Sequence, residues 1–326
     1  MRLHPAVAAV RRGVRQCLAD LPPADDRVVL VACSGGADSL ALLAATVFEA
    51  RASGDRVVGV TVDHGLQEGS TDQARHTVAQ MQALGADETF AVSVTVEGAG
   101  QGPEAAARQA RYAVLDQVAD RVGAGAILLG HTLDDQAETV LLGLTRGSGG
   151  RSIAGMRRGF DRYRRPLLDV RREETEAACV AEGIAFWSDP HNADPRFLRS
   201  RVRLDVMPVL EDHLGPGVAE TLARTADSLR TDMEALDELT EEWLTRADAL
   251  QVAALATLPT AVRRRVLRAA AVRAGALDAE LFHSHVLATD ELVTAWRGQK
   301  WIDLPGHLRA LRRDGAVVFE GSMPAD

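Results

Sequence analysis

The first 130 residues alternate between short apolar runs and amphipathic stretches, a pattern typical of strands separated by helices. The wholly apolar run at 28–33 is typical of a strand buried on both faces. The pattern predicts further strands at 56–62, 89–96 and 126–129, and helices at 38–50, 71–84, 103–122 and 133–144. This alternation indicates βαβ units, so we predict an α/β fold with a doubly wound parallel sheet. In such a sheet, the loops that follow the strands lie along one edge, where ligands bind.

The pattern changes in the second half of the chain. Residues 147–165 are rich in Gly and Arg and have no clear period, which favours a functional loop over a structural element. The Leu-Gly-Pro-Gly sequence at 214–217 marks a domain boundary. Beyond it, leucines at near-heptad spacing predict a long helix over 218–247, and turn signals predict short strands within 301–319. The long helix packs either internally or across a homodimer.

Two domains follow from this organisation. We predict that residues 1–214 form an α/β domain that carries the sheet, and that residues 215–326 form a smaller, mainly helical domain. The 326 residues are 46% hydrophobic and 25% charged, which is typical of a globular protein. No apolar stretch approaches the roughly 20 residues that a membrane-spanning helix requires. The N-terminus has no sustained apolar segment, so we expect a cytoplasmic protein.

Charge and cysteine content narrow the possible functions. The three cysteines lie far apart and form no CxxC pair, which argues against a disulfide framework and gives no metal-site spacing. The net charge is −9, yet residues 146–172 hold nine arginines against two acids, and residues 196–203 hold four arginines and no acid. Contact with phosphate depends on local charge, so an acidic chain can still carry an RNA-binding face.

The strongest chemical signal lies where the first strand gives way to the first helix. Its residues are Ser34, Gly35, Gly36, Ala37, Asp38 and Ser39. Glycines let the backbone approach an anion, and the N–H groups that open the helix form a phosphate cradle with the two hydroxyls. A Walker A motif is excluded because no Gly-Lys-Ser/Thr is present. Such a cradle suits the pyrophosphate part of ATP as a leaving group, with Asp38 holding Mg²⁺.

Further motifs resemble the PP-loop ATP pyrophosphatases, and among them the tRNA(Ile)-lysidine synthetases. The second strand runs into Val-Asp-His-Gly-Leu at 62–66, which is similar to a segment of that family. The resemblance places Asp63 and His64 over the adenosine. Residues 104–112 are similar to the family's E-x-x-A-R-x-x-R-Y helix, and 146–168 to its RGSG, GM and RPLL series.

The segment 189–203 is close to another motif of the family, although His191 and Ser200 depart from the usual residues. Arginine is a permanently charged, bidentate donor to phosphate. The resemblance therefore implies contacts to tRNA or triphosphate from a set of arginines: Arg108, Arg111, Arg146, Arg151, Arg165, Arg199, Arg201 and Arg203.

A second strong match follows the fourth strand, at 130–139. Asp135 and Glu138 are three residues apart and share a helix face, with His131 about one turn earlier. Acids are also favoured at a helix N-terminus by the helix dipole, but here they fall at the sheet edge that holds the phosphate loop. The two acids bind Mg²⁺, with Asp135 as the candidate ligand, or receive the ammonium of lysine. His131 is either catalytic or a hydrogen-bonding strut.

The resemblance implies a ligase that uses ATP, Mg²⁺, L-lysine and tRNA(Ile) with a CAU anticodon. It implies that residues 1–214 are the ATP-binding catalytic domain and that residues 215–326 bind substrate or tRNA. ATP would adenylate the wobble cytosine and release pyrophosphate, and the lysine amine would then attack C2 and expel AMP. Two alternatives remain. A PP-loop tRNA thiolase shares the fold, but usually relies on paired cysteines or an iron–sulfur cluster. A non-catalytic ATP-binding module would bind ATP without turnover.

Overall fold

The computed structural model describes residues 3–63, 69–94, 103–146, 150–189 and 194–322, apart from the side chains at 103–107 and 146. By its internal contacts the chain divides into two compact units. The first comprises residues 1–142 and 155–223, and the second residues 143–154 and 224–326. Two of the three points where the units meet along the chain fall within helices, α5 (Leu133–Arg146) and α10 (Val218–Leu244), and the third follows α6 (Gly150–Ile153). The predicted boundary at 214/215 stays a prediction.

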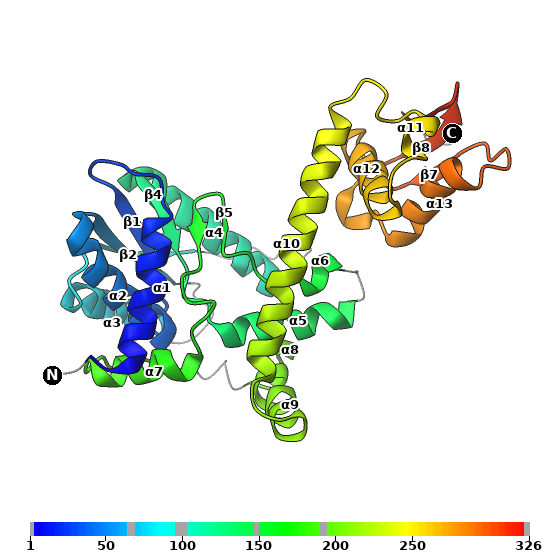
Figure 1. Ribbon diagram of the computed structural model, residues 1–326. Coiled ribbons are helices and arrows are strands. Elements are labelled where there is room, and N and C mark those ends of the chain that lie inside the picture. Colours follow the sequence, from blue (N-terminus) through cyan, green and yellow to red (C-terminus); the bar gives the residue numbers. More distant parts are fainter. Residues whose placement is uncertain (1–2, 64–68, 95–102, 147–149, 190–193, 323–326) are drawn as a thin grey trace. The chain divides into compact units, whose positions relative to one another are not determined.

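The first unit is built on a six-stranded sheet (Figure 1). Its strands are β1 (Val28–Ala32), β2 (Arg56–Asp63), β3 (Glu88–Ser93), β4 (Ala124–Leu128), β5 (Gly159–Phe160) and β6 (Tyr163–Arg164). Their order is β3-β2-β1-β4-β6-β5, and β6 continues the parallel pairing from β4 while β5 runs antiparallel. The predicted parallel sheet is confirmed, and its first four strands lie within a few residues of the predicted positions.

Helices cover both faces of this sheet. Val29 and Val31 of β1 point into a core shared with α1 (Pro5–Ala19), α2 (Ala37–Ser53) and α7 (Arg172–Ala181). Val28 and Leu30, on the opposite face, pack against α4 (Pro103–Val122). Alternating side chains of one apolar strand therefore serve two cores, which explains why the strand sequence is continuously hydrophobic. The remaining helices of this unit are α3 (Ser70–Ala83), α8 (Leu198–Arg201), η2 (Val202–Val206) and α9 (Met207–Leu214).

Two features differ from the sequence-based expectation. Helix α1 was not predicted, although Val7, Val10, Val14 and Leu18 recur at helical spacing and all four are buried. The segment 147–165 was expected to be a functional loop without structural elements, and this was wrong for its described residues. It contains α6 (Gly150–Ile153) and the β5–β6 hairpin, which Asp161 turns with a positive φ of 46°. Phe160 and Tyr163 stack there with ring centroids 5.0 Å apart, and such packing of paired side chains is invisible to periodicity.

The second unit is smaller and mainly helical, as predicted. It contains α11 (Val252–Leu255), α12 (Thr260–Arg273), η3 (Asp278–Glu280) and α13 (His283–Thr294). The predicted short strands are β7 (Ile302–Leu304), β8 (Leu308–Arg313) and β9 (Ala316–Gly321), which form an antiparallel sheet. No helix in the described part of the chain is long and apolar enough to span a membrane.

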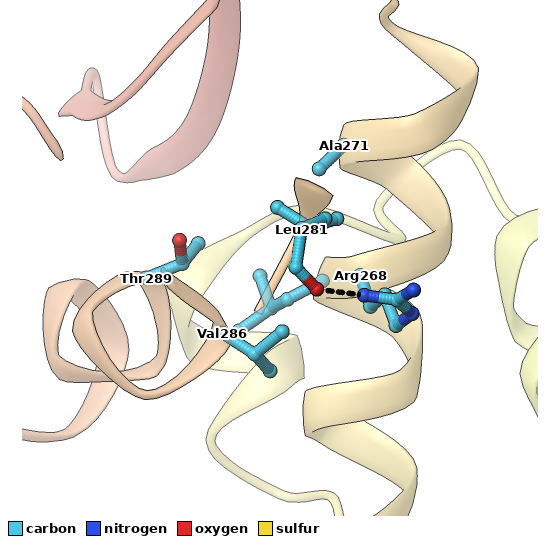
Figure 2. A pocket seen from close by; sticks show the side chains of 6 residues that line it. Arg268, Ala271, Leu281, Val286 and Thr289 are labelled. Carbon is cyan, nitrogen blue, oxygen red and sulfur yellow. Dashed lines mark hydrogen bonds between the residues drawn. The ribbon is translucent and has the colours of Figure 1, made fainter. Parts of the chain in front are cut away.

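A small hollow between α12 and α13 has no room for a water molecule (Figure 2). Arg268 donates a hydrogen bond of 2.5 Å to the Leu281 carbonyl across one side of it. The hollow is therefore a packing feature of the helical core and does not suit a ligand.

A buried ion pair holds α12 to α13. Arg263 donates through Nε to Asp290 at 2.6 Å, and the two side chains are only 9% and 5% exposed. Burial alone would raise the pKa of Asp290, but hydrogen bonds from Arg263 and Arg264 outweigh it and lower the pKa. We expect Asp290→Ala to lower the free energy of unfolding of this unit by about 3 kcal/mol, because it leaves a buried guanidinium without its carboxylate.

Asp303 offers a matched control for this prediction. It pairs with Arg309 at 3.0 Å, but its side chain is 73% exposed. Asp303→Ala should change stability by less than about 1 kcal/mol, since exposed ion pairs contribute little. Urea denaturation of both variants measures the difference, and equal losses would contradict the assigned role of burial.

Candidate active site

The loop between β1 and α2 has the geometry of an anion cradle. The Ser34 N–H donates to Ser39 Oγ at 3.1 Å, and Ser39 Oγ donates to the Gly36 carbonyl at 2.9 Å. Gly35 has a φ of +85°, and a Cβ there would come within 2.6 Å of Thr77 Oγ1. The position therefore requires glycine. No side chain of the described residues caps the N-terminus of α2 through its N-cap, Gly36. The first N–H groups of α2 are thus available to an anion.

A second loop, between β4 and α5, approaches the same helix end. A Cβ on Gly130 would meet the backbone carbon and oxygen of Asp38 and the Cα of Ser39, each at 3.2 Å. Because glycine lacks this atom, the start of α5 comes up against the start of α2. This close approach brings the acids of α5 to the phosphate loop.

Asp38 lies in the first turn of α2, with its side chain 25% exposed. Burial raises the pKa of its carboxyl to about 6, which outweighs the hydrogen bond that it accepts from the Thr175 hydroxyl. The nearby Asp135 carboxylate raises the pKa further. At neutral pH Asp38 is therefore an anion that its surroundings solvate poorly, and this favours a metal or cationic partner.

Asp135 and Glu138 lie on α5 inside a network of arginines. The Glu138 side chain is 1% exposed and accepts from Arg199 Nε at 2.9 Å and from Arg203 Nε at 2.7 Å. Asp135 Oδ2 accepts from the Thr132 N–H at 2.9 Å, while Oδ1 accepts from Arg172 at 2.9 Å. Burial alone would raise the pKa of Asp135, but the arginines and the Thr132 hydrogen bond lower it. The lowered pKa keeps Asp135 charged, and both carboxylates are closely paired with guanidinium groups.

Two residues of this site were not singled out from the sequence. Arg172 contacts Asp38, Asp135 and Glu138 at 3.8, 2.9 and 3.4 Å. It opens α7, and its backbone N–H donates to Asp134 of α5 at 2.7 Å. Thr175, one turn later, reaches Asp38. The arginine-rich composition of 146–172 was visible in the sequence, but which arginine meets the acids depends on how α7 docks against α5.

His131 and Arg165 form a separate polar group beside Asp135. Burial lowers the pKa of His131 to about 4, so the imidazole is neutral at physiological pH. Its Nδ1 accepts from Arg165 Nε at 3.2 Å, which places the ring proton on Nε2. Arg165 is 6% exposed and also donates to the Arg157 carbonyl and the Tyr112 hydroxyl, at 2.6 and 3.5 Å. These three partners are neutral, so the Arg165 charge is not compensated by them.

The other predicted residues lie in several places. Asp63 is buried and accepts from the Thr71 hydroxyl at 3.0 Å, whereas His64 lies outside the described residues. Arg108 and Arg111 are on α4, and Arg108 donates to the Tyr112 hydroxyl at 3.2 Å. Arg151 belongs to the second unit, where it pairs with Asp237 at 2.9 Å.

Two more arginines were predicted to contact substrate. Arg201 is exposed and donates to the Pro195 carbonyl at 3.4 Å, and the side chain of Arg146 is not among those described. The structure therefore brings Asp38, Asp135 and Glu138 together with Arg199 and Arg203.

The residues fit a magnesium ion at Asp38 better than at Asp135. Mg²⁺ is usually held by one or two carboxylates together with substrate phosphates and waters. Asp38 stands beside the phosphate cradle, whereas both oxygens of Asp135 are engaged by Thr132 and the arginines. Among the described residues, no group of three or more His, Cys, Asp or Glu could hold a metal ion. Metal binding by Asp38 and Asp135 stays a prediction.

The fold and the phosphate loop define an ATP-binding domain of the PP-loop class. The PP-loop domain family matches residues 8–210, and the TilS substrate binding domain family matches residues 250–318. A tRNA(Ile)-lysidine synthase of Thermobifida fusca is 54% identical over 318 residues, covering 96% of this chain and 97% of that protein. One of Streptomyces coelicolor is 50% identical over 353 residues, covering 97% and 98%. The chain belongs to the tRNA(Ile)-lysidine synthase family, so the resemblance read from the motifs is confirmed.

A solved structure supports the fold alone. The U34-tRNA thiolase NcsA from Methanococcus maripaludis, with its [4Fe-4S] cluster, superposes with a TM-score of 0.55 at 21% sequence identity. The match covers 69% of this chain and 79% of that one.

The raised pKa of Asp38 leads to a prediction about stability. Its folded-state pKa of about 6 lies above the ordinary value of 3.8, so the folded chain binds more protons than the unfolded chain between these values. Stability conferred by this group is therefore present below pH 4 and lost as pH rises through 6. We expect Asp38→Asn to be more stable than the natural chain by about 3 kcal/mol at pH 8, and nearly equal at pH 4.

Urea denaturation at the two pH values measures this difference. A stability gap that does not change with pH would show that Asp38 ionises as freely in the folded chain as in the unfolded one.

Proposed function

We propose that this chain joins L-lysine to C2 of the wobble cytidine of tRNA(Ile) that bears a CAU anticodon. The cytosine O2 attacks the α-phosphorus of ATP and pyrophosphate leaves. The lysine ε-amine then attacks C2 and expels AMP, and the proton that the amine loses passes to solvent. Family membership supports this assignment, and the observation that carries it is the meeting of Asp38, Asp135 and Glu138 at the phosphate loop. These substrates are found together in the cytoplasm, where we place the enzyme.

The phosphate loop stabilises the leaving pyrophosphate in the first step. The N–H groups that open α2 and the Ser34 hydroxyl would donate to the phosphate oxygens, and the Ser39 hydroxyl could join them by turning from the Gly36 carbonyl. Asp38 would hold Mg²⁺, which when bound neutralises charge on the departing phosphates. Asp63, buried at the end of β2, would lie near the adenosine.

Asp135 and Glu138 bind the lysine amine in the second step. A carboxylate with a lowered pKa pairs well with an ammonium and accepts its proton poorly. Asp135 therefore positions the amine rather than deprotonating it. Neutral His131, held by Arg165, orients the neighbouring side chains and presents an Nε2–H donor toward substrate.

Arg165 and its neighbours are suited to the RNA. Its guanidinium is buried among neutral groups and lies over the Phe160 ring, with 4.9 Å between the guanidinium carbon and the ring centroid. Burial lowers the pKa of Arg165, and a phosphate would compensate its charge. Arg108 lies over the ring of Tyr112 on α4 nearby. An unpaired base of the anticodon loop can be splayed outward and stacked in such a setting.

The thiolase alternative is not supported. Cys17, Cys33 and Cys179 are free thiols, and burial raises their pKa values to about 11, 12 and 12. They carry almost no thiolate at neutral pH, which makes them poor nucleophiles for sulfur transfer.

Incubation with ATP, Mg²⁺, radiolabelled lysine and a tRNA(Ile) transcript bearing CAU tests the proposed function. We expect label in the precipitated RNA that depends on ATP. Asp38→Ala should lower its rate of appearance at least about 100-fold, because it removes stabilisation of the leaving pyrophosphate.

Asp72→Ala is the matched control, since this carboxylate is 80% exposed and pairs with Arg75 in the same helix. This variant should label RNA at the same rate as the natural chain. Failure to label RNA, with ATP instead consumed when a sulfur donor is present, would contradict the proposal.

A further inference from the structure

Arg172 connects the phosphate loop to the acids of α5. Its Nη2 lies 2.9 Å from Asp135 Oδ1 and 3.4 Å from Glu138 Oε1, while its Nε lies 3.8 Å from Asp38 Oδ2. Its side chain is only 22% exposed. One guanidinium therefore touches the carboxylate assigned to the metal and the two carboxylates assigned to the amine.

Charge within this group is balanced. The three carboxylates meet three guanidiniums, those of Arg172, Arg199 and Arg203. A guanidinium and an ammonium are both cationic hydrogen-bond donors, so Arg172 occupies the Asp135–Glu138 pair in the way that a lysine amine would. An added ammonium would leave an uncompensated positive charge beside the buried Glu138. The Arg172 guanidinium must therefore leave the Asp135–Glu138 pair before a lysine ammonium can bind there.

The phosphate loop offers Arg172 a second partner. Asp38 belongs to the first turn of α2, whose free N-terminus is the phosphate cradle, and Arg172 already lies beside it. A triphosphate bound there presents several anionic oxygens, to which arginine binds in bidentate fashion. The Arg172 backbone is fixed by its N–H bond to Asp134, so only the side chain needs to turn.

We propose that Arg172 couples the two substrate sites of this enzyme. In the free chain its guanidinium occupies the Asp135–Glu138 pair, and bound ATP draws it to the phosphates so that the lysine amine can enter. This inference rests on the proposed function and adds to it an order of binding, ATP before lysine. Lysine is thereby kept from the acids until the nucleotide needed for adenylation is in place.

Equilibrium dialysis of radiolabelled L-lysine against the full chain tests this coupling. We expect lysine to bind at least about tenfold more tightly in the presence of Mg²⁺ and a non-hydrolysable ATP analogue. Linkage requires that saturating lysine tighten binding of the analogue by the same factor. This reciprocal measurement uses only the natural chain, so it tests whether lysine and nucleotide binding are coupled even where a variant fails to fold.

Arg172→Ala identifies the residue responsible. Without the analogue, the Kd of this variant for lysine should lie within about threefold of the Kd of the natural chain saturated with analogue. Adding the analogue should then no longer tighten lysine binding by the variant. Arg171→Ala is the matched control, because Arg171 pairs with Asp134 and Glu220 instead, at 3.6 and 3.3 Å. In the Arg171→Ala variant, the analogue should tighten lysine binding by the same factor as in the natural chain.

Two results would overturn the inference, and they are distinguishable. Lysine binding to the natural chain that is equally tight with and without the analogue would refute the role of Arg172 and leave the proposed function intact. No lysine binding under any condition would instead contradict the proposed function, and the inference with it.

Discussion

The buried charge of Glu138 is the constraint on which the rest of the site depends. A carboxylate that is 1% exposed is costly unless cationic donors compensate it. Arg172 at the start of α7, Arg199 in α8 and Arg203 in η2 all reach it. These helices are far from α5 in sequence, so one buried carboxylate ties three later segments to α5. The Arg199 side chain also donates to the Thr139 hydroxyl at 2.9 Å, which holds α8 along the same helix.

The sheet supplies the framework for this cluster. Parallel strands β1 and β4 lie side by side, so the loops that follow them emerge at one edge. Because Gly35 and Gly130 have no Cβ, the two loops can approach their neighbours closely. The site thus combines a helix N-terminus, which favours anions, with a cluster of carboxylates, which favours cations. Binding both partners of an adenylation and amine-transfer reaction requires these opposite properties within a few ångströms of each other.

Much of the fold and of the candidate site could be predicted from local patterns in the sequence. The buried strands, the six-residue phosphate loop and the acids of α5 follow from apolar runs and residue spacing, and the motifs between 62 and 203 pointed to the family. Arg172 and Thr175 were missed because their roles depend on the docking of α7, which no local pattern encodes. The eight arginines proposed for phosphate looked equivalent in the sequence. In the structure, Arg199 and Arg203 are bound to carboxylates, whereas Arg165 meets neutral partners.

A double-mutant cycle on the free energy of unfolding tests whether the buried carboxylate of Glu138 organises the site through its arginine partners. It combines Glu138→Gln with Arg203→Gln, because Arg203 reaches both oxygens of Glu138, at 2.7 and 3.1 Å. We expect a coupling energy of about 2 kcal/mol or more, which is the size expected for a buried, bidentate ion pair. A coupling below about 0.5 kcal/mol would contradict it, because that value is typical of an exposed pair that organises nothing.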